Sequence, residues 1–116
     1  MISYQIYINL KKSVKISIGK LGIIHFCKGL FIYTGSAKTN IDKRIKRHFL
    51  KDKKNHWHID YFLNDKNTEI INVIKSNLLE CDLNMKTYGS FIIRGFGSSD
   101  CKNKCGGHLI FRAFND

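Results

Sequence analysis

The N-terminal third of the chain consists of four short stretches with the two-residue period of β-strands. In the first, every second residue from position 2 to position 10 is apolar, which indicates a strand with one buried face. Similar stretches follow at residues 14–18, 23–26 and 30–33, separated by short turns that contain glycine or lysine. Strands joined by turns this short run antiparallel, because a parallel crossover needs a dozen or more residues. We therefore expect an α+β domain built on a small, mainly antiparallel sheet.

The period then changes to that of a helix between residues 39 and 50. Thr39 and Asp42 have the spacing of a helix start in which Thr39 caps the first turn. The apolar residues at four-residue spacing, which we expect to be buried, are Ile41, Ile45 and Phe49. Arg44 and His48 lie one turn apart and would stand at the edge of this stripe. The side chains predicted to point away from it are Lys43, Lys46 and Arg47.

The C-terminal half is predicted to supply the remaining elements of the same domain. Residues 56–63 are predicted to form a short helix or a turn, and residues 77–88 a second helix, in which Asn77 and Glu80 have the spacing of a capping pair. Strands are expected at residues 70–74, 91–93 and 108–114. The length of 116 residues fits one domain that spans residues 1–116.

The positive charge of the chain is concentrated in its first half. Residues 1–54 hold 13 Lys and Arg against 2 acidic residues, whereas residues 55–116 hold 7 of each. Such asymmetry favours a polyanionic partner, most often nucleic acid, over the alternative of a solubilising surface. The basic side chains expected to bind nucleic acid are Lys38, Lys43, Lys46, Arg47, Lys51, Lys53 and Lys54.

Composition excludes several other classes of protein. Hydrophobic residues make up 43% and charged residues 25%, which is typical of a globular domain and not of a disordered chain. No apolar run approaches the roughly 20 residues of a membrane-spanning helix, and no secretory leader is recognisable. We therefore expect a cytoplasmic protein, in which the four cysteines are thiols or metal ligands and not disulfides.

Several motifs, in their order along the chain, resemble those of the GIY-YIG nucleases. The sequence Leu30-Phe31-Ile32-Tyr33-Thr34-Gly35-Ser36-Ala37 is similar to the second half of that signature, and it runs into a helix with Arg44-Ile45-Lys46-Arg47-His48. Ile2-Ser3-Tyr4 occupies the place of the first half, although only the tyrosine is retained. The two tyrosines are 29 positions apart, and an added pair of strands fits this gap. The remaining motifs resemble a compact subfamily labelled as a domain of unknown function: His56-Trp57-His58-Ile59-Asp60-Tyr61, Glu80-Cys81 and Gly95-Phe96-Gly97-Ser98-Ser99-Asp100-Cys101.

This resemblance implies a metal-dependent endonuclease that cleaves phosphodiester bonds in DNA. It is also compatible with structure-specific cleavage and with a role in DNA repair beside a repair-protein partner. By resemblance, Tyr4 or Tyr33 would orient or deprotonate the attacking water, and Arg44 would hold the phosphate. His48 would support Tyr33 or the phosphate. Glu80 would bind Mg²⁺ or Mn²⁺, with waters as the other ligands. The possible auxiliary residues are His56, His58, Ser98 and Ser99, the two serines because the glycine-rich loop around them could approach a nucleic-acid backbone.

Each of these residues also has a simpler interpretation. Tyr4 and Tyr33 could be packing residues of strands, Arg44 a solvated helix charge, and Glu80 a helix cap. Cys101, Cys105 and His108 have a spacing that a zinc site could use, but a fourth ligand is not evident. The alternative function is a non-catalytic nucleic-acid-binding module, or a partner of a repair enzyme, with the same fold.

Overall fold

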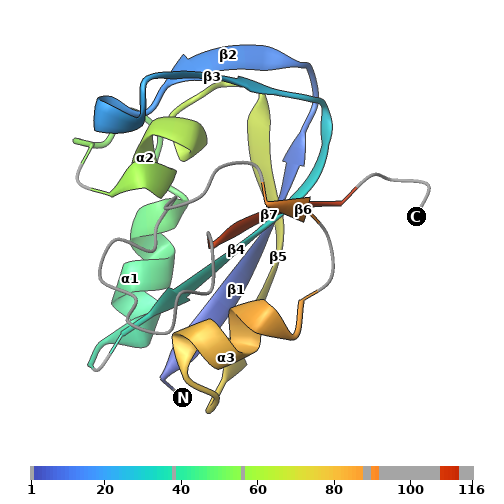
Figure 1. The fold of residues 1–116 in the computed structure, drawn as a ribbon. Helices are drawn as coiled ribbons and strands as arrows, with labels where there is room; N and C mark the ends of the chain where they lie inside the picture. The colour runs from blue at the N-terminus through green and yellow to red at the C-terminus, as the bar shows by residue number, and fades with distance from the viewer. Residues whose placement is uncertain (1, 38, 56, 88–89, 92–107, 113–116) are drawn as a thin grey trace.

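The computed structural model describes residues 2–37, 39–55, 57–87, 90–91 and 108–112 of the chain. The site predictions made for Lys38, His56, Ser98, Ser99, Cys101 and Cys105 fall outside these described residues. The elements are β1 (Ser3–Leu10), β2 (Val14–Ser17), a 3₁₀-helix (Gly19–Leu21), β3 (Ile23–Phe26), β4 (Gly29–Ser36), α1 (Ile41–His48), α2 (His58–Leu63), β5 (Thr68–Ser76), α3 (Glu80–Met85), β6 (Ser90–Phe91) and β7 (Leu109–Arg112) (Figure 1).

The main sheet has five strands in the order β5-β1-β4-β7-β6, and every neighbouring pair is antiparallel. Strands β2 and β3 form a separate antiparallel pair between β1 and β4 in the sequence. The prediction of an α+β fold with an added strand pair is therefore confirmed. Leu10 and Gly29 are separated by 18 residues, and these residues form the added pair outside the main sheet, so β1 and β4 are still direct neighbours in it.

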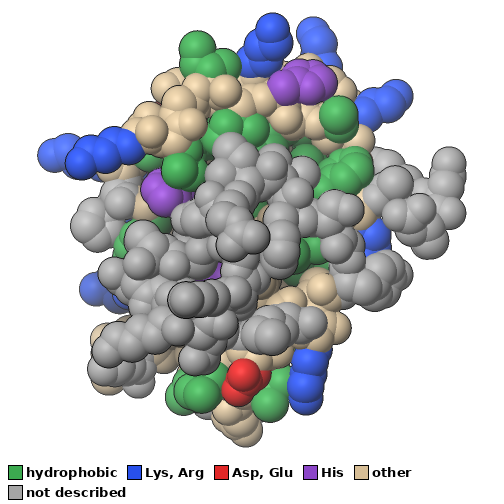
Figure 2. All heavy atoms as spheres, viewed as in Figure 1, with side chains coloured by type: hydrophobic (Ala, Val, Ile, Leu, Met, Phe, Trp, Pro, Cys, Tyr) green, Lys and Arg blue, Asp and Glu red, His purple; other side chains and the backbone are tan. Residues whose placement is uncertain are grey.

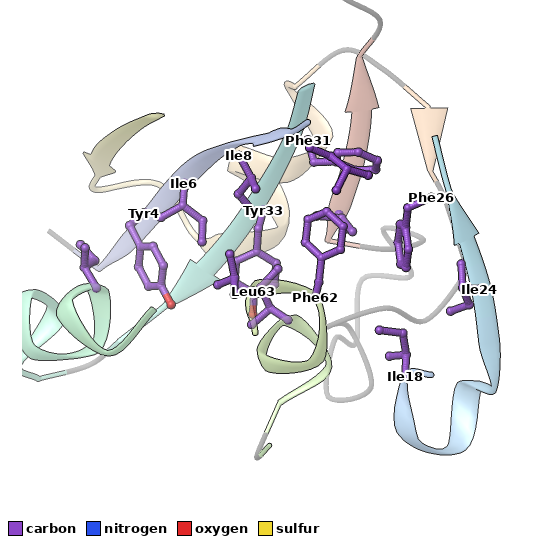
Figure 3. Close-up of a cluster of buried hydrophobic side chains, with 14 residues drawn as sticks. Tyr4, Ile6, Ile8, Ile18, Ile24, Phe26, Phe31, Tyr33, Phe62 and Leu63 are labelled. Atoms are coloured by element: carbon purple, nitrogen blue, oxygen red, sulfur yellow. The ribbon is translucent and has the colours of Figure 1, made fainter. Parts of the chain in front are cut away.

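One face of the sheet forms the main hydrophobic core. Tyr4, Ile6 and Ile8 of β1 lie in it with side chains of β4, and the added strand pair contributes its own apolar side chains (Figure 3). The helix α2 packs against this core. The ring centroid of Phe62 lies 4.8 Å from that of Phe26 and 5.0 Å from that of Phe31. The short helix is held mainly by this apolar burial, since six residues are too few for an isolated helix to be stable.

The opposite face of β1 is also covered, which the alternation pattern did not predict. Gln5 is buried, and its side-chain amide donates to Thr34 Oγ1 at 3.1 Å and to Thr87 Oγ1 at 2.6 Å. Thr87 lies two residues after the end of α3, so these bonds fix α3 against this face. The expectation that β1 has one buried face is therefore wrong near its N-terminal end, where α3 covers polar residues that alternate with the core residues.

The helix predictions need three corrections. The helix α1 begins at Ile41 after Asn40, whose left-handed backbone (φ 54°) makes the turn, and no side chain caps the helix, so the expected Thr39 cap is wrong. Phe49 lies beyond the end of α1 and is exposed, so it does not join the buried stripe. The helix α3 is shorter than expected and begins after Leu79 without a side-chain cap, which excludes the Asn77 capping pair.

Candidate functional site

Tyr4 and His48 form a buried pair between β1 and α1. Tyr4 Oη lies 2.6 Å from His48 Nε2, and each residue is only 1% exposed. The ring of Tyr33, from β4, lies 5.8 Å from the His48 ring between centroids. The structure therefore brings together three of the four residues for which the sequence predicted catalysis. Tyr7, the other tyrosine of β1, lies on the opposite side of the strand by alternation.

Gly35 makes this arrangement possible. It is paired with Tyr4 across the β1–β4 ladder, and a Cβ atom built on Gly35 would lie 2.5 Å from Tyr4 Oη and 2.6 Å from its Cζ atom. No real contact is that close, so any larger residue would displace the Tyr4 ring. The glycine after Tyr33-Thr34 thus leaves space for the hydroxyl of the other tyrosine.

Arg44 brings a positive charge to the same place. It lies half-buried on α1, and its guanidinium donates to the carbonyl of Ser36 at the end of β4. Its charge lowers the pKa of both Tyr4 and Tyr33, although burial has the larger effect and raises both pKa values above the ordinary range. Both phenols are therefore protonated at neutral pH.

His48 is electrically neutral at the same pH. Burial lowers its pKa from the ordinary value of 6.5 to about 4, and the lysine and arginine charges around it act in the same direction, while Asp60 opposes them. Its Nδ1 atom is buried without a hydrogen-bond partner among the described residues. A neutral imidazole beside a phenol can accept a proton from it, or donate one to it, depending on the tautomer.

Sequence reasoning missed a second group of interacting side chains next to Arg44. Asp60 is fully buried and accepts two hydrogen bonds from the Arg47 guanidinium, at 2.8 and 3.0 Å, and one from the Trp57 backbone N–H at 2.9 Å. The guanidinium carbons of Arg44 and Arg47 lie 4.7 and 4.6 Å from the Trp57 ring centroid. The prediction that Arg47 points toward solvent is wrong, because this ion pair holds it against Trp57. The Trp57-x-x-Asp60 spacing at a helix start was the available signal.

Glu80 lies at the first position of α3, where its side chain is 27% exposed and Oε2 is 3.3 Å from His108 Nδ1. By strand alternation and the Thr87 hydrogen bond, α3 covers the sheet face opposite to Tyr4 and Tyr33. The Glu80 charge nevertheless contributes to raising the pKa of both tyrosines. No group of three or more His, Cys, Asp or Glu that could hold a metal occurs among the residues that the structure describes.

The predicted nucleic-acid-binding residues divide into two groups. Lys43, Lys46 and Lys54 are exposed. Lys51, by contrast, donates to the carbonyls of Leu63, Asp65 and Thr68 and to Thr68 Oγ1 at 2.6–2.9 Å.

Lys53 donates to the Leu50 carbonyl at 2.6 Å, and burial lowers its pKa to about 8. These two ammonium groups hold the segment between α1 and α2 in place. Of the auxiliary candidates, His58 begins α2 half-buried, and burial lowers its pKa.

The surface carries an excess of positive charge. On the face drawn in Figure 2, Lys and Arg side chains project widely from the margins, whereas Asp and Glu are sparse. No helix within the described ranges is long and apolar enough to cross a membrane.

The comparisons with known proteins identify the family but not an activity. The chain belongs to the family described as domain of unknown function DUF123, whose model matches residues 3–116. The predicted resemblance to a compact family labelled in this way is therefore confirmed. No curated protein and no solved structure matches the chain.

Proposed function

We propose that this protein is a metal-dependent endonuclease that hydrolyses phosphodiester bonds in DNA. The observation that carries the proposal is the hydrogen bond of 2.6 Å between Tyr4 and His48, with Tyr33 and Arg44 beside it. Phosphodiester hydrolysis needs an oriented water, an acceptor for its proton and positive charge for the developing oxyanion. These side chains offer a group suited to each task. The likeness of the motifs around them to the GIY-YIG nucleases supports the same activity.

The roles follow from the protonation states of the side chains. With His48 protonated at Nδ1, its Nε2 accepts the Tyr4 proton, and the phenol oxygen keeps lone pairs that can orient a water. Because burial keeps both phenols protonated, neither acts as a phenolate base unaided. His48 is the neutral group that can take up a proton through Tyr4. Arg44 supplies the planar pair of N–H donors that binds a phosphate.

Glu80 is the residue that fits a divalent cation. Its carboxylate is partly exposed, and a hard cation such as Mg²⁺ binds through one carboxylate with waters as its other ligands. Asp60, the other carboxylate near the tyrosines, does not fit, because it is fully buried and engaged by Arg47. When bound, the cation would supply charge stabilisation to the phosphate oxygens.

One observation favours a second function. Tyr4 and His48 are each 1% exposed and Tyr33 is 7% exposed, which is also what a purely structural trio of side chains would show. In that case the protein is a nucleic-acid-binding module, or the binding partner of a repair enzyme, that retains the fold without the chemistry.

The decisive experiment combines a substrate panel with a matched pair of variants. Labelled duplexes, flaps, junctions and single strands are incubated with Mg²⁺, Mn²⁺ or EDTA. We expect metal-dependent cleavage that Tyr4→Phe slows by on the order of 10²-fold, since only the hydroxyl is lost. Tyr7→Phe, which removes a hydroxyl from the same strand, should leave the rate unchanged. Tight binding without cleavage of any substrate would favour the binding module.

A further inference from the structure

A basic pocket lies beside the tyrosine site, on the outer side of α1. It has a volume of about 640 Å³ and is lined by α1, by the residues just before it and by the segment that leads to α2. This volume lies within the roughly 300–1,000 Å³ of pockets that bind small organic ligands. Arg44 lines this pocket and also contributes to the electrostatics of the two tyrosines, so the pocket adjoins the candidate catalytic site.

The chemistry of the pocket fits a ligand that is both anionic and aromatic. Six of its ten lining residues are Lys or Arg, and none is acidic. Leu50 and Trp57 add apolar surface, and Leu50 is 58% exposed, so its side chain is accessible to a ligand. A phosphate alone would need only the cations, whereas a nucleobase also uses aromatic and apolar surface for stacking.

The aromatic part of the pocket is held rigidly before any ligand binds. Asp60 fixes the Trp57 backbone and the Arg47 guanidinium, and this guanidinium also donates to the carbonyl of Lys54 at 3.0 Å. The guanidinium groups of Arg44 and Arg47 lie over the indole ring, and a guanidinium plane is itself a surface on which a base can stack. A surface fixed in this way loses little conformational entropy when it binds.

We propose that this pocket binds one unpaired nucleotide of a single-stranded segment that flanks the phosphate held by Arg44. The base contacts Leu50 and Trp57, and its phosphate contacts Lys43 and Lys46. The assignment rests on the proposed function and narrows the substrate to nucleic acid with a single-stranded portion. A continuous duplex would use the cationic rim alone, because its bases are stacked within the helix and do not reach the apolar surface.

Trp57 allows a test that does not depend on cleavage, because it is the only tryptophan in the chain. The intrinsic fluorescence is titrated in EDTA with single-stranded oligothymidylate of about ten nucleotides and with a duplex of the same length. Binding is followed in parallel by the anisotropy of a labelled oligonucleotide. We expect the single strand to change the Trp57 emission saturably, and the duplex to bind with a much smaller change.

A matched pair of variants separates the pocket from general charge effects. Leu50→Glu places a carboxylate in the pocket, whereas Phe49→Glu makes the same change of charge at a neighbouring residue that is 53% exposed and lies outside it. Leu50→Glu should weaken single-strand binding about tenfold or more. Phe49→Glu should weaken it by less than about twofold, because exposed charges are screened. Lys46→Glu, with the exposed Lys20→Glu as its control, provides a second pair.

The outcomes are distinguishable from those of the nuclease proposal. The proposed nucleotide pocket is wrong if the two variants of each pair weaken single-strand binding equally. It is also wrong if the single strand binds without changing the Trp57 emission, or if the duplex changes that emission as strongly as the single strand does. If these results accompany metal-dependent cleavage, the nuclease proposal stands without the pocket. If the pocket binds the single strand as expected and no substrate is cleaved, the nuclease proposal fails and the pocket stands.

Discussion

At Gly35 the need for a particular residue type comes from a partner 31 positions earlier in the chain. A Cβ atom there would occupy the place of the Tyr4 hydroxyl, which in turn bonds His48. One small residue therefore determines whether the two tyrosines and the histidine can meet. The glycine of the Tyr33-Thr34-Gly35 motif is therefore required by a contact between β1, β4 and α1, and not only by the local backbone of β4.

His48 should make folding stability depend on pH. Its pKa is 6.5 in the unfolded chain and about 4 in the folded protein, so the unfolded chain binds more protons between these values. The neutral His48 therefore contributes to folding stability above pH 6.5, and this contribution is lost as the pH falls to 4. The loss lowers the free energy of unfolding by about 3 kcal/mol. Urea denaturation at pH 7 and pH 4 should show a smaller difference for His48→Gln than for the parent.

The control for this change is His25→Gln, at an exposed residue of β3. It should keep the pH dependence of the parent protein. An unaltered pH dependence in His48→Gln would mean that burial does not hold the imidazole neutral in the folded protein.

Individual residues could be predicted from the sequence only where a local pattern identified them. Tyr4 and His48 follow from strand and helix periodicity together with the family motif. Asp60 does not, because a lone acid at a helix start is usually a surface cap, and its burial depends on Arg47, 13 residues earlier. The Trp57-x-x-Asp60 spacing could have signalled the local bond to the Trp57 backbone, but the pairing with Arg47 is decided by packing and cannot be read from spacing.

Within α1, Arg44 and Arg47 have different surroundings although their charge is the same. We expect Arg44→Lys to lower the single-turnover cleavage rate by on the order of 10²-fold, because lysine lacks the planar pair of donors. Arg47→Lys should leave most of the rate but reduce the free energy of unfolding by about 1–2 kcal/mol, because the paired hydrogen bonds to buried Asp60 are lost. Rates and urea denaturation curves are measured for both variants.

These two variants also discriminate between functions. If the rate falls equally in both, then Arg44 has no special place beside the tyrosines. If neither variant changes the rate, Arg44 is a surface charge and the proposed phosphate contact is wrong.

The helix α3 carries the predicted metal ligand. Glu80→Gln keeps the size of the side chain but removes the charge that a hard cation requires, so it should abolish Mg²⁺-dependent cleavage while thermal unfolding changes little. Asp82→Asn, an exposed acid on the same helix, should cleave like the parent. Cleavage by Glu80→Gln at the parental rate would remove Glu80 from the metal site.

Most helices and strands could be predicted from the sequence, but their ends could be predicted only where a local pattern marked them. Strand β3 begins and ends where the pattern predicted, and β4 extends the predicted stretch because its ladder with β1 continues to Ser36. The length of α3 was overestimated, since no apolar stripe or cap marks its ends. Thr39 did not cap α1 because Asn40 turns the chain into the helix through its left-handed backbone.

At the scale of the whole molecule, helices on both faces of the sheet contribute to the candidate site. On one face, α1 and α2 enclose the tyrosines and the histidine in the apolar core. On the other, α3 is fixed by Gln5 and brings the carboxylate of Glu80 close enough to influence the tyrosines electrostatically. The positive half of the sequence includes α1, whose outer side is lined by Lys43, Lys46 and Arg47, so the basic surface and the candidate site meet at Arg44.

This arrangement predicts which lysines contribute to the salt dependence of DNA binding. Lys43 and Lys46 are exposed on α1, so the double substitution to alanine should reduce the slope of log K against log salt by about two, which is the loss of two phosphate contacts. The matched control replaces Lys15 and Lys20, which are also exposed and lie on the added strand pair and its turn, and it should leave the slope unchanged. Fluorescence anisotropy at several salt concentrations measures both. Because the two double variants lose the same charge, equal slopes would show that binding depends on net charge and that the outer side of α1 is not the nucleic-acid interface.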